Sequence, residues 1–331
     1  MLAAPLFTGT LFALAAGLMW GLVFVGPLLL PEYPATLQSF GRYLAFGLIA
    51  LPLAWFDRRT LRQLTREDWV EALKLALIGN VVYYLFLSSA IQRAGGPLPT
   101  MIIGTLPVVI AVSANLGGRR AGTRVEAKFG WGQLAPSLAL IAAGIALVNR
   151  VELEQLRQDP SADLARYALG AALAVGAVVC WTWYPIRNAQ WLRAHPDRSP
   201  RGWATAQGLA TLPLALVGYA LTWAWFAVRD DTFPMPFGPR PLAFIGLMAA
   251  IGLFASWLGT LCWNEASQRL PPTLAGQLIV FETLSALAYA FMLRGQAPQP
   301  LTLAGIALLV AGVLSALRAK PEPASAQAHP H

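Results

Sequence analysis

Ten apolar runs, each long enough to form a membrane-spanning helix, occupy most of this chain. A helix needs about 20 apolar residues to cross the hydrocarbon core of a bilayer. Of the 331 residues, 56% are hydrophobic and only 12% are charged, whereas soluble domains contain about 25% charged residues. The sequence therefore predicts an all-α integral membrane protein, with spans at residues 8–30, 34–56, 69–91, 97–117, 131–149, 166–190, 202–226, 242–264, 272–293 and 300–318.

Basic residues cluster in alternate loops between these runs. They follow the second, fourth, sixth, eighth and tenth spans, as in Arg58 and Arg59 after the second. In the other loops the basic residues are fewer and are mixed with acids. Because Lys and Arg are enriched in cytoplasmic loops, this pattern predicts a plasma membrane protein of the bacterial inner-membrane type, with both termini in the cytoplasm. It also accounts for the net charge of +8 without nucleic-acid binding, for which no motif is present.

A polar stretch, VELEQLRQDPSAD at residues 151–163, divides the spans five and five. Short echoes link the halves in the same order, for example SAIQR at 89–93 with EASQR at 265–269. Because five is odd, the second half would enter the membrane from the opposite side, which makes an inverted repeat. We expect repeats at 1–150 and 165–318, an extracytoplasmic linker at 151–164 and a disordered tail at 319–331. The alternative is that apolar helices resemble one another by composition.

Polar and aromatic side chains inside the spans are the candidates for a binding site, because polar groups in lipid usually face a bundle interior. Asn80 can share a helix face with Tyr83 or Tyr84, and Trp257 can share one with Asn264. We expect a substrate cavity lined by Trp20, Asn80, Tyr83, Tyr84, Trp181, Tyr184, Trp257, Asn264, Gln277 and Phe281. Tryptophans at span ends, such as Trp203, are instead expected at the membrane interface.

Two charged residues lie inside the predicted spans. Glu282 interrupts the apolar run LIVFETLSALAYAF, where an ionised carboxylate is costly. It can exchange a proton, bind a substrate amino group, or have a structural role. Arg42 can bind a substrate carboxylate through its planar guanidinium, or it can pair with Glu32 as a loop clamp.

Three prolines fall inside predicted spans and remove backbone hydrogen bonds. Pro27, Pro107 and Pro185 are therefore candidate gating kinks. A purely architectural kink is the alternative at each.

Several of these features together resemble the drug/metabolite transporter superfamily of the EamA type. They are Trp20 and Trp181 at matching places, Pro107 in the fourth span, and a Gly-rich final helix in each half. Trp263-Asn264 and the following VFETLSALAYA are similar to YddG-type exporters of aromatic amino acids. In two places the chain departs from those exporters, because Gly104-Thr105-Leu106-Pro107 lacks their tryptophan and Thr283 replaces a usual proline.

This resemblance implies a ten-helix bundle around a central cavity that exports amino acids or similar metabolites by alternating access. The alternatives are another metabolite or drug class as substrate, or an intramembrane enzyme. No HExxH or GxSxG motif supports an enzyme, and no Walker phosphate loop supports ATP hydrolysis. We expect a monomer that binds a small molecule, lipid and, as a candidate coupling ion, the proton. We expect no cofactor and no metal.

Overall fold

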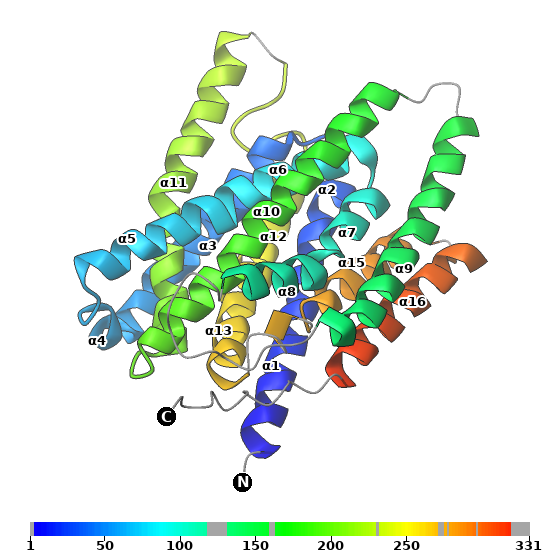
Figure 1. Cartoon of the computed structure of the whole chain (residues 1–331). Helices are drawn as coiled ribbons and strands as arrows, with labels where there is room; N and C mark the ends of the chain where they lie inside the picture. Colours follow the sequence, from blue (N-terminus) through cyan, green and yellow to red (C-terminus); the bar gives the residue numbers. More distant parts are fainter. Residues whose placement is uncertain are drawn as a thin grey trace, which may run out of the picture.

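The apolar runs form helices because a backbone in hydrocarbon must satisfy its own hydrogen bonds. The computed structural model describes residues 3–117, 131–158, 163–229, 232–270, 275–276, 278–295 and 297–318. In these residues every regular element is helical (Figure 1). Six helical segments are long and apolar enough to cross a membrane, namely Pro5–Leu29, Ala35–Phe56, Arg66–Ala94, Leu164–Ala194, Pro200–Val228 and Pro241–Arg269. Four shorter apolar segments, at Leu98–Ile110, Ala135–Leu147, Val280–Leu293 and Pro300–Gly312, coincide with the remaining predicted spans.

The elements follow one another along the chain with few connecting residues. Up to residue 158 they are α1 (Ala3–Trp20), η1 (Gly21–Phe24), α2 (Val25–Leu29), α3 (Ala35–Phe56), α4 (Arg58–Leu61), α5 (Arg66–Lys74), η2 (Leu75–Val82), α6 (Tyr83–Ala94), α7 (Pro97–Ile103), α8 (Leu106–Gly117) and α9 (Trp131–Gln158). From residue 164 they are α10 (Leu164–Ala194), α11 (Pro200–Val228), α12 (Pro241–Ile251), η3 (Gly252–Leu258), α13 (Gly259–Arg269), α15 (Val280–Arg294) and α16 (Pro300–Arg318).

Three of the long segments change helix type in the middle, and the first of them, Pro5–Leu29, contains the 3₁₀ segment η1. The third and eighth predicted spans contain the π-helical segments η2 and η3, each followed directly by an α-helix. Such segments are rare and occur frequently at functional sites. The fourth predicted span is interrupted at Gly104 and Thr105, so that Pro107 lies in the first turn of α8. A proline is tolerated there because the first-turn N–H has no partner within the helix.

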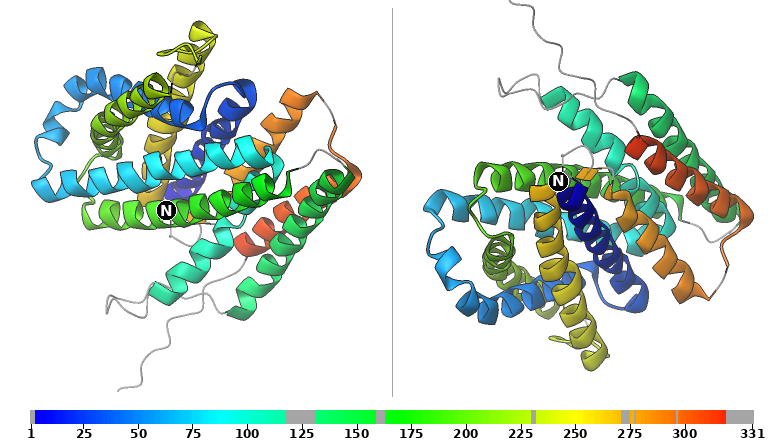
Figure 2. Two further views of the ribbon diagram at one scale, coloured as in Figure 1. Left: turned by 90° about the horizontal axis from the view of Figure 1, so that it is seen from above. Right: turned by 90° about the horizontal axis from the view of Figure 1, so that it is seen from below.

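Helices from the two halves of the chain pack against one another. The principal pairs are α3 with α11, α6 with α10, α1 with α13, and α9 with α16. The pair α9 and α16 lies at one edge of the bundle, side by side in both views of Figure 2. The main core involves the other helices, and a smaller core of Met101, Ile141, Leu287 and Leu309 lies against the α9 and α16 pair.

Glycines bring α1 close to α15. A Cβ at Gly17 would lie 3.0 Å from the backbone N of Glu282, and one at Gly21 would lie 2.7 Å from Cβ of Ser285. Small residues let helix backbones approach closely in membrane proteins. This contact places Glu282 in the interior of the bundle.

Candidate functional site

Glu282 lies in the first turn of α15 and is 1% exposed. The Trp181 indole Nε1–H donates to Oε2 of Glu282 over 2.9 Å, and the Tyr83 hydroxyl donates to Oε1 over 3.4 Å. Each carboxylate oxygen thus accepts from a neutral donor on another helix. No Lys or Arg forms an ion pair with Glu282 within the described part of the chain. The carboxyl is therefore held in place without a neutralising cation.

Trp181 is the centre of an aromatic cluster from four helices, which we define as Trp20, Tyr83, Trp181, Tyr184 and Trp263. The Trp181 ring stacks on Tyr83, with centroids 4.5 Å apart, and on Tyr184, with centroids 5.1 Å apart. Trp20 meets Trp181 edge to face at 4.9 Å and lies 5.2 Å from Trp263. All five rings are buried. Two members of the cluster, Tyr83 and Trp181, also bind the Glu282 carboxyl.

A chain of side-chain hydrogen bonds leads from this aromatic cluster along α10 and α11. The Tyr184 hydroxyl donates to Oε1 of Gln207 over 2.8 Å, and Nε2 of Gln207 donates to Oδ1 of Asn188 over 3.1 Å. The same Oδ1 accepts from Nε1 of Trp203, and Nδ2 of Asn188 donates to Oδ1 of Asn264, both over 2.8 Å. Each of these four hydrogen bonds joins a donor to an acceptor atom, and together they fix the orientations of the Gln207 and Asn188 amides.

Arg42 lies on α3 and is 4% exposed. Its Nε donates to the Ser256 hydroxyl in η3 over 3.0 Å. The guanidinium carbon lies 4.4 Å from the Tyr84 ring centroid and 4.9 Å from that of Tyr43. Among the described residues, Arg42 and Glu282 do not form an ion pair with each other. Arg42 and Glu282 thus have separate partners in the interior.

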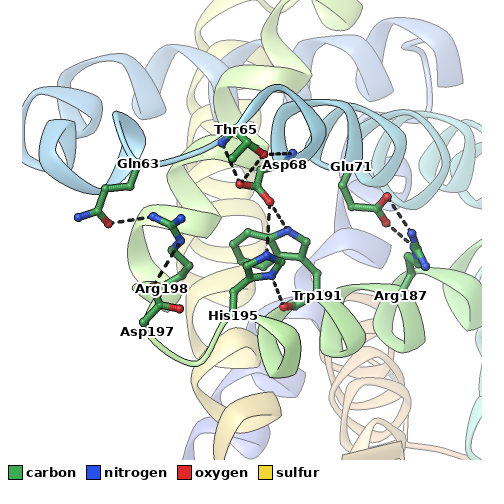
Figure 3. Close-up of polar contacts among 9 residues, drawn as sticks. All are labelled: Gln63, Thr65, Asp68, Glu71, Arg187, Trp191, His195, Asp197 and Arg198. Carbon is green, nitrogen blue, oxygen red and sulfur yellow. Dashed lines mark hydrogen bonds and ion pairs between the residues drawn. The ribbon is translucent and has the colours of Figure 1, made fainter. Parts of the chain in front are cut away.

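Figure 3 shows a second polar region, centred on Asp68 of α5, which we call the Asp68 cluster and which includes Thr65, Trp191 and His195. Asp68 and Thr65 form a capping box at the start of α5. Oδ1 of Asp68 accepts from Nε1 of Trp191 over 2.9 Å and lies 3.8 Å from Nε2 of His195. Trp191 stacks on Trp203 with centroids 3.5 Å apart. Trp191 follows Trp181 by ten residues, so the Asp68 cluster lies about 15 Å along α10 from the aromatic cluster.

Two further ion pairs tie neighbouring helices together beside the Asp68 cluster. Arg187 of α10 donates to both oxygens of Glu71 of α5, with Nε 2.5 Å from Oε1 (Figure 3). Asp57 accepts from the Thr205 hydroxyl over 2.7 Å and lies 3.2 Å from Nε of Arg201. These contacts join the segment 57–74 to α10 and α11.

The structure brings some of the expected site residues together and separates others. Tyr83 and Trp181 contact Glu282, and Trp20 and Tyr184 contact the Trp181 ring. Trp257 instead donates to the Thr205 hydroxyl over 3.3 Å, and Asn264 accepts a hydrogen bond from Nδ2 of Asn188.

The other expected residues lie around these. Asn80 donates to the Thr211 hydroxyl over 3.2 Å, while Tyr84 donates to the Val23 carbonyl over 3.0 Å. Phe281 is half-buried, and its Cβ lies 3.1 Å from the position that a Cβ on Gly17 would take. Pro27 lies in α2 just after the 3₁₀ segment η1, and Pro185 lies within the continuous helix α10. Gln277 lies outside the described residues.

Two expectations about surface contacts were wrong. Glu32 pairs with Arg240 at 2.5 Å rather than with Arg42, because Arg42 points into the bundle toward Ser256. Trp203, expected at the membrane interface, is 0% exposed, because its indole stacks on Trp191 and bonds Asn188. The sequence reasoning also missed Gln38, Asn188, Gln207 and Ser256, although buried amides four residues from another polar group, as in Gln38 and Arg42, are a usable signal.

A helical membrane protein in which aromatic rings, the Glu282 carboxyl and the Arg42 guanidinium are buried has the character of a transporter, and sequence comparison agrees. Residues 7–150 match the EamA-like transporter family. The chain is 58% identical over 315 residues to the inner membrane protein YtfF of Escherichia coli strain K12, with 95% of this chain and 96% of that protein aligned. The chain therefore belongs to the EamA-like transporter family of the drug/metabolite transporter superfamily.

A solved structure supports the fold. Its title reads only "Crystal structure of protein", and it superimposes with a TM-score of 0.66 at 19% sequence identity. The match covers 94% of this chain and 98% of that one. The likeness therefore extends over nearly the whole fold.

Proposed function

We propose that the protein exports small amphipathic metabolites, foremost amino acids with aromatic or other apolar side chains, across the inner membrane by alternating access. The single observation that carries this proposal is the buried Glu282 with its two neutral donors, Trp181 and Tyr83, inside the aromatic cluster. Ligand sites are mostly apolar with a few placed polar groups. In this proposal the aromatic cluster receives the apolar side chain of the substrate, and Glu282 carries a proton that is exchanged for it.

The proposed architecture is two inverted five-helix repeats, residues 1–150 and 165–318, joined by an extracytoplasmic linker at 151–164. Matching contacts support it. The π-helical segments η2 and η3 occupy corresponding places in the third and eighth spans. Arg42 of α3 bonds Ser256 of η3, and Asn80 of η2 bonds Thr211 of α11. The first of these bonds joins the second span to the eighth, and the other joins the seventh span to the third. In a five-plus-five repeat these two pairs of spans correspond to each other. The tail at 319–331 lies outside the described residues.

Alternating access also requires two gates. The Asp68 cluster and the Glu71 and Arg187 pair lie next to the loops that follow the second and sixth spans, at the start of α5 and the end of α10. We assign them to the cytoplasmic gate, with both termini on that side. The residues of the aromatic cluster are buried, so substrate entry requires helices to separate. Contacts between α5 and α10 must then break while the helices stay intact, with Pro27, Pro107 and Pro185 as the proposed bending points.

The test is flux into proteoliposomes that contain the purified protein as a monomer. The panel comprises phenylalanine, tryptophan, leucine, glutamate, a sugar and a nucleotide, each with and without an imposed pH gradient. We expect phenylalanine, tryptophan and leucine to cross fastest and the gradient to change their rate. Equal rates for the sugar or nucleotide, or an absence of amino-acid flux, would reject the amino-acid proposal.

A further inference from the structure

Arg42 has hydrogen-bonding capacity that the protein does not use. Its side chain is 4% exposed, its Nε donates to Ser256, and its Nη1 is buried without an acceptor. No carboxylate in the described residues forms an ion pair with it. Buried charges are normally paired, and a charged residue inside a membrane helix usually marks a functional site. The free N–H calls for an anionic acceptor.

The surroundings hold the guanidinium in place but do not neutralise it. The rings of Tyr84 and Tyr43 attract it by cation–π contact, at 4.4 and 4.9 Å from the guanidinium carbon. A ring face accepts no in-plane N–H bond of the kind that a carboxylate accepts. Arg42 is thus oriented in advance for a ligand that supplies a carboxylate.

Gln38, one turn earlier on α3, has an unused hydrogen-bond acceptor, whereas Arg42 has an unused donor. Its Nε2 donates to the carbonyls of Leu30 over 2.9 Å and Tyr33 over 3.0 Å. These two acceptors fix the amide orientation, so that Oε1 must face the other way. Oε1 is buried and accepts no hydrogen bond. A free acceptor therefore lies four residues from a free cationic donor, on the same side of the helix.

Tyr84 borders both groups. A Cβ placed on Gly26 would lie 3.1 Å from the Tyr84 hydroxyl and 3.4 Å from Oε1 of Gln38. The free oxygen is thus close to the tyrosine whose ring covers Arg42. A residue larger than glycine at position 26 would press on both groups and on Cδ1 of Ile251, 3.3 Å from the same Cβ position.

Resting on the proposed transport function, we propose that Arg42 and Gln38 bind the main-chain end of the transported amino acid. Nη1 of Arg42 donates to the α-carboxylate, and Oε1 of Gln38 accepts from the α-ammonium. An α-amino acid carries a donor and an acceptor side by side, which matches the two unused atoms. Amines that lack a carboxylate satisfy only Gln38, and carboxylic acids that lack an amine satisfy only Arg42. The side chain is left free to reach the aromatic cluster.

The test is competition for binding of radiolabelled L-phenylalanine to the full-length purified protein. The competitors are phenethylamine, which lacks the carboxylate, and 3-phenylpropionate, which lacks the amine. On the wild-type protein we expect each competitor to bind about 10- to 100-fold more weakly than phenylalanine, the range typical of one lost charge-assisted bond. This comparison needs no variant and so does not depend on whether a variant folds.

Variants then assign the effect to atoms. Arg42→Gln should lower phenylalanine affinity about 10- to 100-fold and leave phenethylamine affinity unchanged, so that the two ligands bind alike. Arg150→Gln, at an exposed arginine, is the matched control and should keep the wild-type ratio.

Equal binding of phenylalanine and phenethylamine by the wild type would overturn the Arg42 assignment while leaving amino-acid transport standing. An unchanged ratio in a folded Arg42→Gln protein would overturn it too. If the wild type binds none of the three compounds, the proposed function fails, and this inference fails with it.

Discussion

The Trp181 indole donates to Oε2 of Glu282 over 2.9 Å while its ring stacks on Tyr83, the residue that donates to the other carboxylate oxygen. One tryptophan thus orients the carboxyl and also packs against its second partner. Because the ring and the N–H perform separate tasks, substitution can separate them.

Trp181→Phe keeps an aromatic ring and removes the N–H donor. We expect phenylalanine flux in proteoliposomes to fall about 10-fold, in line with the loss of one hydrogen bond to a charged or ionisable group. Trp225→Phe, at a tryptophan that is 57% exposed, should transport at the wild-type rate. Equal rates for the two variants would show that the indole N–H has no part in transport.

Glu282→Gln keeps the size of the side chain and removes the exchangeable proton. We expect flux driven by an imposed pH gradient to fall to the rate measured without the gradient, because no other buried carboxyl lies in the aromatic cluster among the described residues. The measurement compares the two conditions for wild type and variant in the same vesicle preparation. A variant that still responds to the gradient would assign proton coupling to another residue.

Gly79→Ala tests how tightly the π-helical segment η2 packs against α10. A Cβ at position 79 would lie 2.1 Å from Cδ2 of Tyr184, and Tyr184 is held by stacking on Trp181 and by its bond to Gln207. We expect a loss of about 1 to 3 kcal/mol in the free energy of unfolding, the usual cost of overpacking. Thermal unfolding in detergent measures it.

Gly246→Ala is the matched control on α12, because a Cβ there meets nothing within 4 Å. Since alanine has the higher helix propensity, this variant should match or exceed the wild-type unfolding temperature. If both glycine variants unfolded at the wild-type temperature, the tight contact with Tyr184 would be refuted.

Glu71→Gln weakens the bidentate contact with Arg187 that joins α5 to α10. Glu71 is 8% exposed and Arg187 is 47% exposed at the side chain, so solvent screens the pair and we expect a loss of only about 1 kcal/mol. If the pair belongs to the cytoplasmic gate, a cysteine introduced beside Tyr184 should react faster with a water-soluble thiol reagent in the variant than in the protein with Glu71. The control, Glu154→Gln in the exposed pair with Arg150, should change neither quantity.

The positions of the helices were predictable because hydrophobic composition over some 20 residues determines what can cross a bilayer. All ten predicted spans coincide with apolar helical segments, although four of these are shorter than a full crossing. The break at Gly104 and Thr105 lies just before Pro107, one of the candidate kinks, whereas the π-helical segments were not predictable. They depend on how side chains such as Tyr184 fit against Gly79, which local sequence does not encode.

The sequence predicted several residues of the candidate site but not which of them contact one another. Trp181 and Glu282 are 101 residues apart in the chain, and Tyr83 and Glu282 are 199 apart. The rarity of polar groups in lipid identifies each residue alone, whereas pairing them requires the helix packing. The same limit left a pair of Arg42 with Glu32 open as an alternative, although Glu32 pairs with Arg240, which is distant in sequence but near in space.

The stacked indoles of Trp191 and Trp203, 3.5 Å apart and inclined by 8°, give the molecule a built-in optical reporter. Two stacked indoles at this spacing couple their electronic transitions, so that their combined spectrum differs from that of two separate indoles. One ring belongs to α10 and the other to α11, so the signal exists only while these helices remain together at the Asp68 cluster. Time-resolved spectra of the unlabelled protein would then follow separation of the two helices directly.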